Sequence, residues 1–441
     1  MHDFFDRLQQ LGVVETPVRT QARPPDVTKY LNGCALGTGG SLDGVDHLFS
    51  LDPGLVNMDA STVGAPLRGL HEADEPICST FGGIRANLAQ SFGCETDEIA
   101  ITNSTTDSIS KILLGLDLSP GDEVVVTDNE HFGSLAPLAV LRDRLGIRLK
   151  VVTLPFGHDQ TAEDILARFE QQVSDSTRLV LFSALTANLG TRLPVREIAG
   201  LAQRHGAITL VDAAHVPGML DIDFHDWGAD FAAGSGNKWQ CGPPGTGLVY
   251  IRNRVLAEYN PNPLPVFWPA ASIWYPLEGG LPARTSGRHP TYDIAEYVQN
   301  AGAASIARLQ ALETACEIWQ ALGRKRIEAA ILGLSASLRD RIVAELGPGN
   351  LFSPHGDPRL LSGLTAYNPF RDAGAIFDPT RIDRFIARLE TDHGIIVKRV
   401  DFPLHGRTAS AVRVSTRLYH RSDDLDRFIA ASTQTARRER G

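Results

Sequence analysis

The chain has 441 residues, of which 43% are hydrophobic and 21% are charged, and its formal net charge is −10. This composition is typical of a soluble globular protein, and the length suits two domains. The negative charge is spread along the chain, which argues against sequence-independent binding to nucleic-acid phosphates. No stretch approaches the about 18 apolar residues of a membrane span, so we expect neither a nucleic-acid nor a membrane partner.

The cysteines and the N-terminal segment indicate the compartment. The five cysteines are scattered and form no C-x-x-C pair, a distribution that indicates neither a zinc site nor a redox dithiol. The opening segment MHDFFDRLQQLGVVETP has no basic stretch followed by an apolar run, so we expect no secretory signal. These features predict a cytoplasmic protein in a reducing environment.

The predicted elements begin after an irregular N-terminal arm at 1–55, which is rich in Pro, Gly and Asp. Apolar runs then predict strands at 99–101, 123–128, 149–154, 178–185, 207–213, 230–235 and 245–252. Amphipathic spacing predicts intervening helices at 105–118, 135–146, 162–173 and 195–206. Apolar strands that alternate with amphipathic helices are typical of a mostly parallel sheet buried on both faces.

A change of pattern near residue 295 indicates a second, smaller domain. Helices are expected at 293–322 and 327–346, strands at 362–368, 394–400 and 410–416, and a closing helix at 422–433. We therefore predict an α/β fold, with a large domain at 56–295 that holds the mostly parallel central sheet and a smaller α+β C-terminal domain at 296–441.

Polar residues follow several predicted strands, where ligands bind in an open parallel sheet. Lys238 lies in SGNKWQCGPPGTG, at the start of a loop rich in Gly and Pro. Asp212 directly follows an apolar strand, where a carboxylate is costly without a positive partner. The segment NSTTD leads into a helix, so Ser104, Thr105 and the helix N-terminus offer donors to an anion.

Two histidines complete this set: His131 in NEHFGS and His215 in VDAAHVPG. Taken singly, each feature also fits a plain alternative, namely a solvated lysine, a simple helix N-cap or a structural histidine. Taken together, an amine, a carboxylate, a flat imidazole and an anion cup are what pyridoxal 5'-phosphate requires. The sequence therefore predicts this cofactor, with Lys238 condensing with its aldehyde in a Schiff base and Asp212 holding its ring nitrogen protonated.

Five motifs follow one another along the chain: AITNSTTDSI, DNEHFGS, LVDAAHVPG, SGNKWQCGPPGTGLVY and VRVSTRLYH. In this order they resemble the class V aminotransferases of fold type I, a family that includes cysteine desulfurases, selenocysteine lyases and isopenicillin N epimerases. The resemblance spans most of the chain, from about residue 57 to the end. It implies a large domain that binds pyridoxal phosphate.

The resemblance also implies individual roles around the cofactor ring. Lys238 matches the Schiff-base lysine and Asp212 matches the partner of the pyridine nitrogen. His131 matches the ring that stacks on the cofactor, and His215 matches a position that approaches the cofactor's phenolic oxygen.

Further positions match phosphate and substrate ligands. Ser104, Thr105 and Ser235 match phosphate ligands, and Asn237 stands where desulfurases often have a phosphate-binding histidine. Arg413, in VRVS, matches the arginine that binds the substrate α-carboxylate, a task suited to a guanidinium fork. The alternative for Arg413 is a surface arginine on a strand edge.

Two departures from the family pattern affect the predicted reaction. The family often has a cofactor-facing Asn in the loop before LGT, where this chain has Ala187, and the neighbouring Asn188 receives no role. Persulfide-forming desulfurases carry a nucleophilic cysteine shortly before the carboxylate-binding arginine, but IIVKRVDFPLHGRTASAVRVS contains none. Cys241 lies near Lys238 in sequence, and we expect it to be structural. Persulfide transfer is therefore disfavoured.

The remaining choice is among reactions that begin with removal of the α-proton by freed Lys238, which the family carries through a quinonoid. The EH pair at His131 resembles the desulfurase and lyase branch, whereas DAAHVPG and TRLPV resemble the isopenicillin N epimerase-like branch, which includes C–S lyases. We predict an enzyme acting at Cα of an amino acid, preferably by β-elimination from an S-substituted cysteine. An aminotransferase or epimerase is the alternative within the family. A non-catalytic binding or regulatory protein, the alternative from another class, is disfavoured because both Lys238 and Asp212 are present.

The segment 261–293 is rich in aromatic residues and arginines: Phe267, Trp268, Trp274, Tyr275, Arg284 and Arg288. In the family this region lines the active site, partly that of the neighbouring subunit. The segment is expected either to stack on the substrate side chain or to form a hydrophobic dimer contact. Both interpretations predict a homodimer.

Overall fold

The structure is a computed structural model that describes residues 45–49, 56–59, 67, 81–252, 277–278, 281–282, 294–299 and 305–439. The predicted arm at 1–55, apart from 45–49, and the aromatic segment at 261–293, apart from 277–278 and 281–282, lie outside these residues. Among the described helices, none combines the length and the apolar content needed to cross a membrane.

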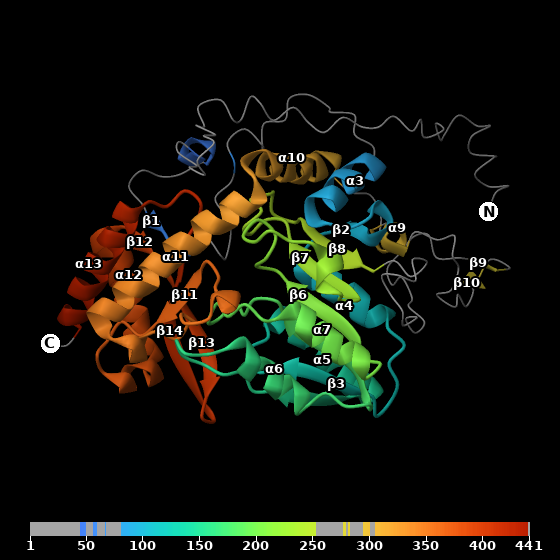
Figure 1. Ribbon diagram of the computed structural model, residues 1–441, viewed down its shortest axis with the longest axis horizontal. Helices are drawn as coiled ribbons and strands as arrows, with labels where there is room; N and C mark the ends of the chain where they lie inside the picture. The colour runs from blue at the N-terminus through green and yellow to red at the C-terminus, as the bar shows by residue number, and fades with distance from the viewer. Residues whose placement is uncertain are drawn as a thin grey trace.

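A seven-stranded sheet forms the centre of the larger part of the molecule (Figure 1). Its order is β2 (Ile99–Thr102), β8 (Gly247–Ile251), β7 (Phe231–Ser235), β6 (Ile208–Ala213), β5 (Thr177–Ser183), β3 (Glu123–Thr127) and β4 (Arg148–Val152). The pairs β7–β6, β6–β5, β5–β3 and β3–β4 are parallel, and β8 is antiparallel to both of its neighbours. The predicted mostly parallel sheet and the α/β fold class are confirmed.

Both faces of this sheet are buried, because alternate strand residues enter two separate cores. One core packs strand residues such as Phe182 and Val211 against α3 (Phe81–Phe92), α6 (Ala162–Glu170), α7 (Val195–Arg204) and α10 (Ile306–Leu322). The other packs strand residues such as Leu181 and Leu210 against α4 (Thr105–Gly115), α5 (Phe132–Leu145) and α9 (Ile294–Gln299). The near-continuous apolar runs in the central strands follow from this burial on both sides.

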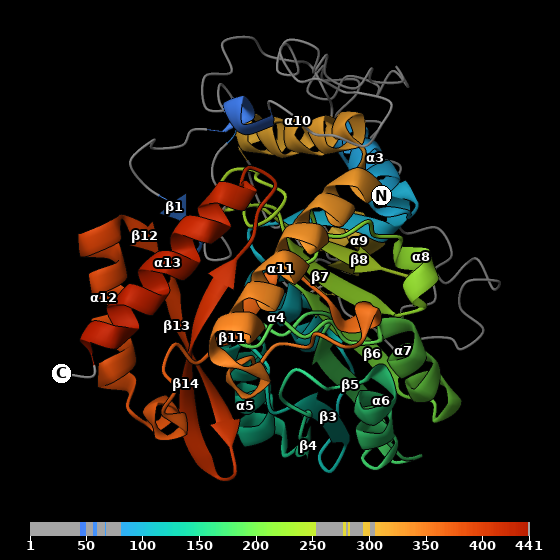
Figure 2. The ribbon, with the colours of Figure 1, turned by 60° about the vertical axis from the view of Figure 1, so that its left-hand side comes forward.

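The C-terminal part forms a smaller α+β layer beside the sheet (Figure 2). Its antiparallel sheet has the order β11 (Leu364–Tyr367), β14 (Arg407–Ser415) and β13 (Lys398–Leu404). Helices α11 (Arg324–Leu346), α12 (Pro379–His393) and α13 (Ser422–Arg438) share a core with this sheet. β1 (Val56–Asn57) pairs in parallel with β12 (Ile395–Ile396), so the chain just before the large sheet is attached to the C-terminal part.

The single helical run predicted at 293–322 is wrong in its continuity, because α9 and α10 are separate and Ser305 has an extended backbone (φ −75°, ψ 104°). Ser305 is of a residue type favoured at helix N-caps, and it stands as the N-cap of α10. α12 was not predicted, although Pro379 at its start and the Asp378 side chain, which accepts from Arg381 N (3.0 Å), are ordinary helix-start signals. The division at 295/296 stays a prediction, and α10 packs on α3.

Candidate active site

The sheet topology brings the predicted site residues to one edge. β3, β6 and β7 run in the same direction, so the loops that carry His131, His215 and Lys238 leave the sheet at the same side. β2 is antiparallel to β8, as is β7, and therefore runs with them and delivers Ser104 to the same edge. The sequence prediction of a site at the carboxyl ends of the strands matches this arrangement.

Lys238 is half-buried in the loop after β7, with its Nζ 3.4 Å from His215 Nε2. Desolvation lowers the pKa of Lys238 to about 8, and Arg413 and Lys398 act in the same direction, whereas Asp212 opposes them. A substantial fraction of the amine is therefore neutral near physiological pH. A neutral amine is the form that attacks an aldehyde or takes a proton from carbon.

Asp212 is the penultimate residue of β6 and is 5% exposed. Its Oδ2 accepts a hydrogen bond from Ser134 Oγ (2.6 Å) and its Oδ1 accepts from Ala214 N (2.9 Å). Both oxygens are thus fixed by donors, one from the first turn of α5 and one from the residue that follows β6. A carboxylate held in this way suits the stabilisation of a positive ring nitrogen, the role that the resemblance implies for it.

His131 is the N-cap of α5, and its Nδ1 accepts from Gly133 N (3.0 Å). Burial lowers the pKa of His131, and the charge of Lys238 lowers it further. A Cβ on Gly133 would lie 2.5 Å from Thr106 Oγ1 and 3.0 Å from His131 Nδ1, so glycine permits this close cap. The backbone donor leaves the hydrogen of the neutral ring on Nε2.

The N-terminus of α4 is the predicted anion cup. Ser104 is its N-cap, and its Oγ accepts from Asp107 N (3.0 Å), which agrees with the plain N-cap alternative and leaves the hydroxyl hydrogen available. Gly247 pairs with both Thr102 and Ser235, and a Cβ on it would lie within 3 Å of the Ser104 backbone. Ser104 and Ser235 therefore flank the same glycine.

Two observations on this cup bear on a phosphate group. Thr105 Oγ1 is buried and makes no hydrogen bond within the described part of the chain. Ser235 Oγ donates to Asn237 Oδ1 (2.7 Å), so the Asn237 amide nitrogen remains as a donor. An unsatisfied buried hydroxyl at a helix N-terminus fits a phosphate ligand, and with the Lys238 amine and the Asp212 carboxylate the donor set fits pyridoxal 5'-phosphate.

Arg413 lies on β14, is 5% exposed and faces this edge of the large sheet. One of its guanidinium nitrogens donates to the carbonyl oxygen of Ala187, and Nη2 forms an ion pair with Asp59 Oδ1 (3.0 Å). At position 187, where the family often has an Asn, this chain thus supplies the backbone carbonyl of Ala187. The plain alternative, a surface arginine, is wrong, because Arg413 is buried and paired with an acid.

Cys241 follows Lys238 by three residues and is 3% exposed, with a left-handed backbone (φ 58°). Burial raises the pKa of its thiol. Its Sγ lies 3.8 Å from Lys238 O and 3.6 Å from Arg417 Nη1. These contacts favour the structural role predicted for it, since a reactive cysteine needs access and a low pKa.

Sequence reasoning missed several residues that contact this site: Asp59, Ser134, Lys398 and Arg417. Arg417 Nη2 donates to Lys238 O (3.1 Å), and its guanidinium lies 4.4 Å from the centre of the Trp239 ring. Lys398 is the register partner of Arg413 on β13. Arg417 stands in the quoted motif VRVSTRLYH, whereas Asp59 is distant in sequence and carried no local signal.

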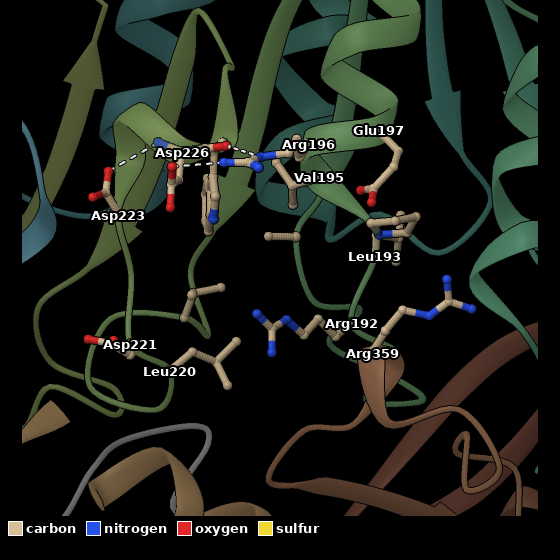
Figure 3. Close-up of a pocket in the computed structure, with 14 residues that line it drawn as sticks. Arg192, Leu193, Val195, Arg196, Glu197, Leu220, Asp221, Asp223, Asp226 and Arg359 are labelled. Atoms are coloured by element: carbon tan, nitrogen blue, oxygen red, sulfur yellow. Dashed lines mark hydrogen bonds and ion pairs between the residues drawn. The ribbon is translucent and has the colours of Figure 1, made fainter. Parts of the chain in front are cut away.

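A separate cavity of about 480 Å³ lies beside α7 and α8 (Phe224–Trp227) (Figure 3). None of the predicted site residues lines it. Its arginines are paired with acids: Arg192 with Glu328, Arg196 with Asp226, and Arg359 with Glu163 and Asp357. This pairing leaves the cavity without the chemistry of the Lys238 region.

The sequence model described as Aminotransferase class-V matches residues 57–356, which is more than half of the chain. The chain therefore belongs to the class-V aminotransferase family. This confirms the predicted family, the prediction of an enzyme and the prediction of pyridoxal phosphate as cofactor.

Individual relatives carry two kinds of name. A probable cysteine desulfurase of Halobacterium salinarum is 29% identical over 374 residues, which is 82% of this chain and 83% of that protein. An isopenicillin N epimerase of Streptomyces clavuligerus is 26% identical over 403 residues, which is 86% of this chain and 95% of that protein.

Solved structures share the fold. A cysteine desulfurase from Thermococcus onnurineus NA1 has a TM-score of 0.68 with 22% identity and covers 87% of this chain and 95% of its own. A cystine C–S lyase in complex with cysteine persulfide has a TM-score of 0.66 with 21% identity, over 85% and 96% of the two chains.

Proposed function

We propose that the protein is a β-eliminating C–S lyase that acts on an S-substituted cysteine. The observation that carries the proposal is the amine of Lys238, desolvated to a pKa of about 8, 3.4 Å from His215 Nε2 and in the field of Asp212. Such an amine is suited to removing a proton from the Cα of a bound amino acid.

Pyridoxal phosphate, when bound, supplies an electron sink that makes the Cα–H bond of an attached amino acid acidic. Lys238 would hold the cofactor, and Asp212 would hold its ring nitrogen in the protonated state. Ser104, Thr105, Ser235 and Asn237 would bind the phosphate at the N-terminus of α4, whose positive end favours an anion.

The substrate would be oriented by Arg413, whose guanidinium suits an α-carboxylate, while His131 and His215 would flank the ring. Lys238 would take the α-proton and pass it to the departing sulfur. The Cβ–S bond breaks with its electron pair going to sulfur. Overall, an S-alkylcysteine and water give a thiol, pyruvate and ammonia, so no oxidant or reductant is required.

Elimination is favoured over persulfide transfer by the sulfur chemistry of the site. The β13–β14 hairpin and the segment before it, residues 395–415, contain no cysteine. Cys241 is buried, with a raised thiol pKa. A leaving thiolate would therefore depart to solvent instead of passing its sulfur to the protein.

An epimerase is the second candidate, because the relatives named isopenicillin N epimerase match over 95% of their length. An epimerase also begins with transfer of the α-proton, and it leaves the side chain intact. An aminotransferase would differ from both in needing a 2-oxo acid.

We further propose that the enzyme is a cytoplasmic homodimer.

The test compares the purified full chain with its Lys238→Ala variant. We expect a visible absorption band from the lysine-bound cofactor in the native chain alone, and release of thiol and pyruvate from S-methyl-L-cysteine without added 2-oxo acid. A native band with only D-isomer formation would favour the epimerase. A band that persists in Lys238→Ala would contradict the assignment of Lys238.

A further inference from the structure

The indole of Trp239 and the imidazole of His215 are joined by a buried hydrogen bond. Trp239 Nε1 lies 3.2 Å from His215 Nδ1, Trp239 is 0% exposed and His215 is 5% exposed. An indole N–H is only a donor, so Nδ1 must be the unprotonated acceptor of this bond. The hydrogen of the neutral imidazole is then on Nε2, the nitrogen 3.4 Å from Lys238 Nζ.

We propose that Trp239 is a positioning residue that fixes His215 as the Nε2–H tautomer, so that His215 donates a hydrogen bond toward Lys238 and keeps the lysine amine neutral. A donor directed at the amine can be accepted only by its unprotonated form, because an ammonium group has no lone pair. Trp239, the residue that follows Lys238 in the chain, thus acts through His215 to hold the lone pair of the Lys238 amine in place.

The backbone around this pair is closely packed. Gly218, at the end of the loop that carries His215, has φ 85°, and a Cβ there would lie 2.3 Å from backbone atoms of Trp239 and Gln240. At the indole itself, a Cβ on Gly363 would lie 2.8 Å from Trp239 Cη2, and the Arg417 guanidinium lies 4.4 Å from the ring centre. The indole is therefore closely packed against Gly363 and Arg417, which restricts the direction of its N–H.

The charges around His215 and Lys238 also favour the neutral forms of both side chains. Burial lowers the pKa of His215 well below its ordinary value, and the nearby cations lower it further, which leaves the ring neutral. The groups that face His215 are Lys238, Arg413, His131 and Arg417, and those that face Lys238 are Asp212, Arg413 and Lys398. Of these, only Asp212 favours the charged lysine.

The inference deepens the proposed function, since it concerns the state of the lysine that the reaction uses. In this tautomer, His215 donates a hydrogen bond from Nε2 to any acceptor beside that nitrogen. His215 therefore cannot act as a base toward Lys238. His131 is held in the same tautomer by an independent donor, the Gly133 N–H at 3.0 Å.

The chain supplies a matched control in Trp319. Its Nε1 donates to Gly218 O (2.9 Å), three residues along the loop from His215, and its side chain is 2% exposed. Trp319→Phe therefore removes a buried indole hydrogen bond that supports the same loop, but leaves the bond to His215 in place. Trp239→Phe removes the bond to His215 and keeps an aromatic ring.

Two readouts on the full chain freed of cofactor test the proposal. The first is the ring-nitrogen spectrum of ¹⁵N-histidine-labelled protein, with His215 assigned by the signal lost in His215→Gln. The second is the pH dependence of acetylation of Lys238, followed by peptide mass spectrometry, which gives the pKa of its amine. Thermal unfolding shows that each variant is folded.

The native chain and Trp319→Phe are expected to show the Nε2–H tautomer at His215 and equal Lys238 pKa values. In Trp239→Phe, Nε2 becomes free to accept from an ammonium, so the Lys238 pKa should rise by about one unit, a tenfold change in the ratio of charged to neutral amine. In the His215→Gln background, Trp239→Phe should produce no further shift.

Three results would overturn the proposal: an Nδ1–H tautomer in the native chain, the same pKa rise in Trp319→Phe, or a full pKa rise from Trp239→Phe when His215 is already replaced. Neither readout involves turnover, so failure of this inference and failure of the proposed reaction are separate results.

Discussion

Replacing Asp59 with asparagine should strengthen binding of the amino-acid substrate. Asp59 is paired with Arg413, the residue proposed to bind the α-carboxylate, at 3.0 Å from Nη2. Two hydrogen bonds hold the backbone beside it, since Met58 N donates to Ile396 O (2.8 Å) and Ser415 N donates to Met58 O (2.5 Å). A substrate carboxylate must therefore share the guanidinium with a carboxylate that is already anchored there.

The expected magnitude follows from the charges. Two carboxylates on one guanidinium stand about 5 Å apart, and at an effective dielectric constant of about 20 they repel by about 3 kcal/mol. Asparagine removes this repulsion and keeps the shape and a weaker hydrogen bond. At about 1.4 kcal/mol for each factor of ten, we expect the KM for S-methyl-L-cysteine to fall by about tenfold to a hundredfold in Asp59→Asn.

The assay is steady-state release of thiol, with kcat and KM determined separately. Asp383→Asn is the matched control, because Asp383 forms an ion pair with Arg399 on β13, away from Arg413. This control should leave KM unchanged. A KM that rises in Asp59→Asn would refute the reasoning, since it would mean that Asp59 holds Arg413 in position for the substrate and does not compete with it.

Three further predictions concern pH and stability. The rate at which the cofactor-free chain captures pyridoxal phosphate, followed by absorbance, should rise with pH with an inflection near pH 8 and level off above it, because the neutral Lys238 amine reacts and its pKa is lowered to about 8; an inflection above pH 10 would contradict this. Burial raises the pKa of Glu130 to about 7 despite hydrogen bonds from Ser183 and Thr127. The folded state therefore holds an extra proton, and urea unfolding should show stability falling as pH rises from about 4.5 to about 7 relative to Glu130→Gln, whereas equal pH slopes would refute it. Because the pKa of His215 is lowered, stability should also fall as pH drops below 6.5, and this loss should be smaller in His215→Gln.

Local sequence signals were sufficient for most of the large sheet. The central strands are apolar on both faces, so their positions follow from composition alone, and each predicted strand from 99 to 252 overlaps an observed one. Lys238, Asp212 and His131 could be proposed from the sequence because they stand at or just after strand ends, and the ends of parallel strands lie close together in space.

The parts that sequence could not supply depend on contacts between distant residues. The Asp59–Arg413 pair joins positions 354 residues apart, and it exists because β1 pairs with β12. The tautomer of His215 depends on a bond to an indole 24 residues away. Ser134 was visible in the motif DNEHFGS, but its bond to Asp212 required the relative placement of β3 and β6.

The measurement that tests the central claim most directly is a ¹H NMR time course of the full chain, loaded with pyridoxal phosphate, with S-methyl-L-cysteine in ²H₂O and without a 2-oxo acid. The account predicts loss of the Cα proton signal together with the appearance of methanethiol and pyruvate, and none of these changes in Lys238→Ala. Exchange of the Cα proton with the S-methyl group retained would contradict the lyase assignment, and an unchanged spectrum would contradict the role of Lys238 as the base.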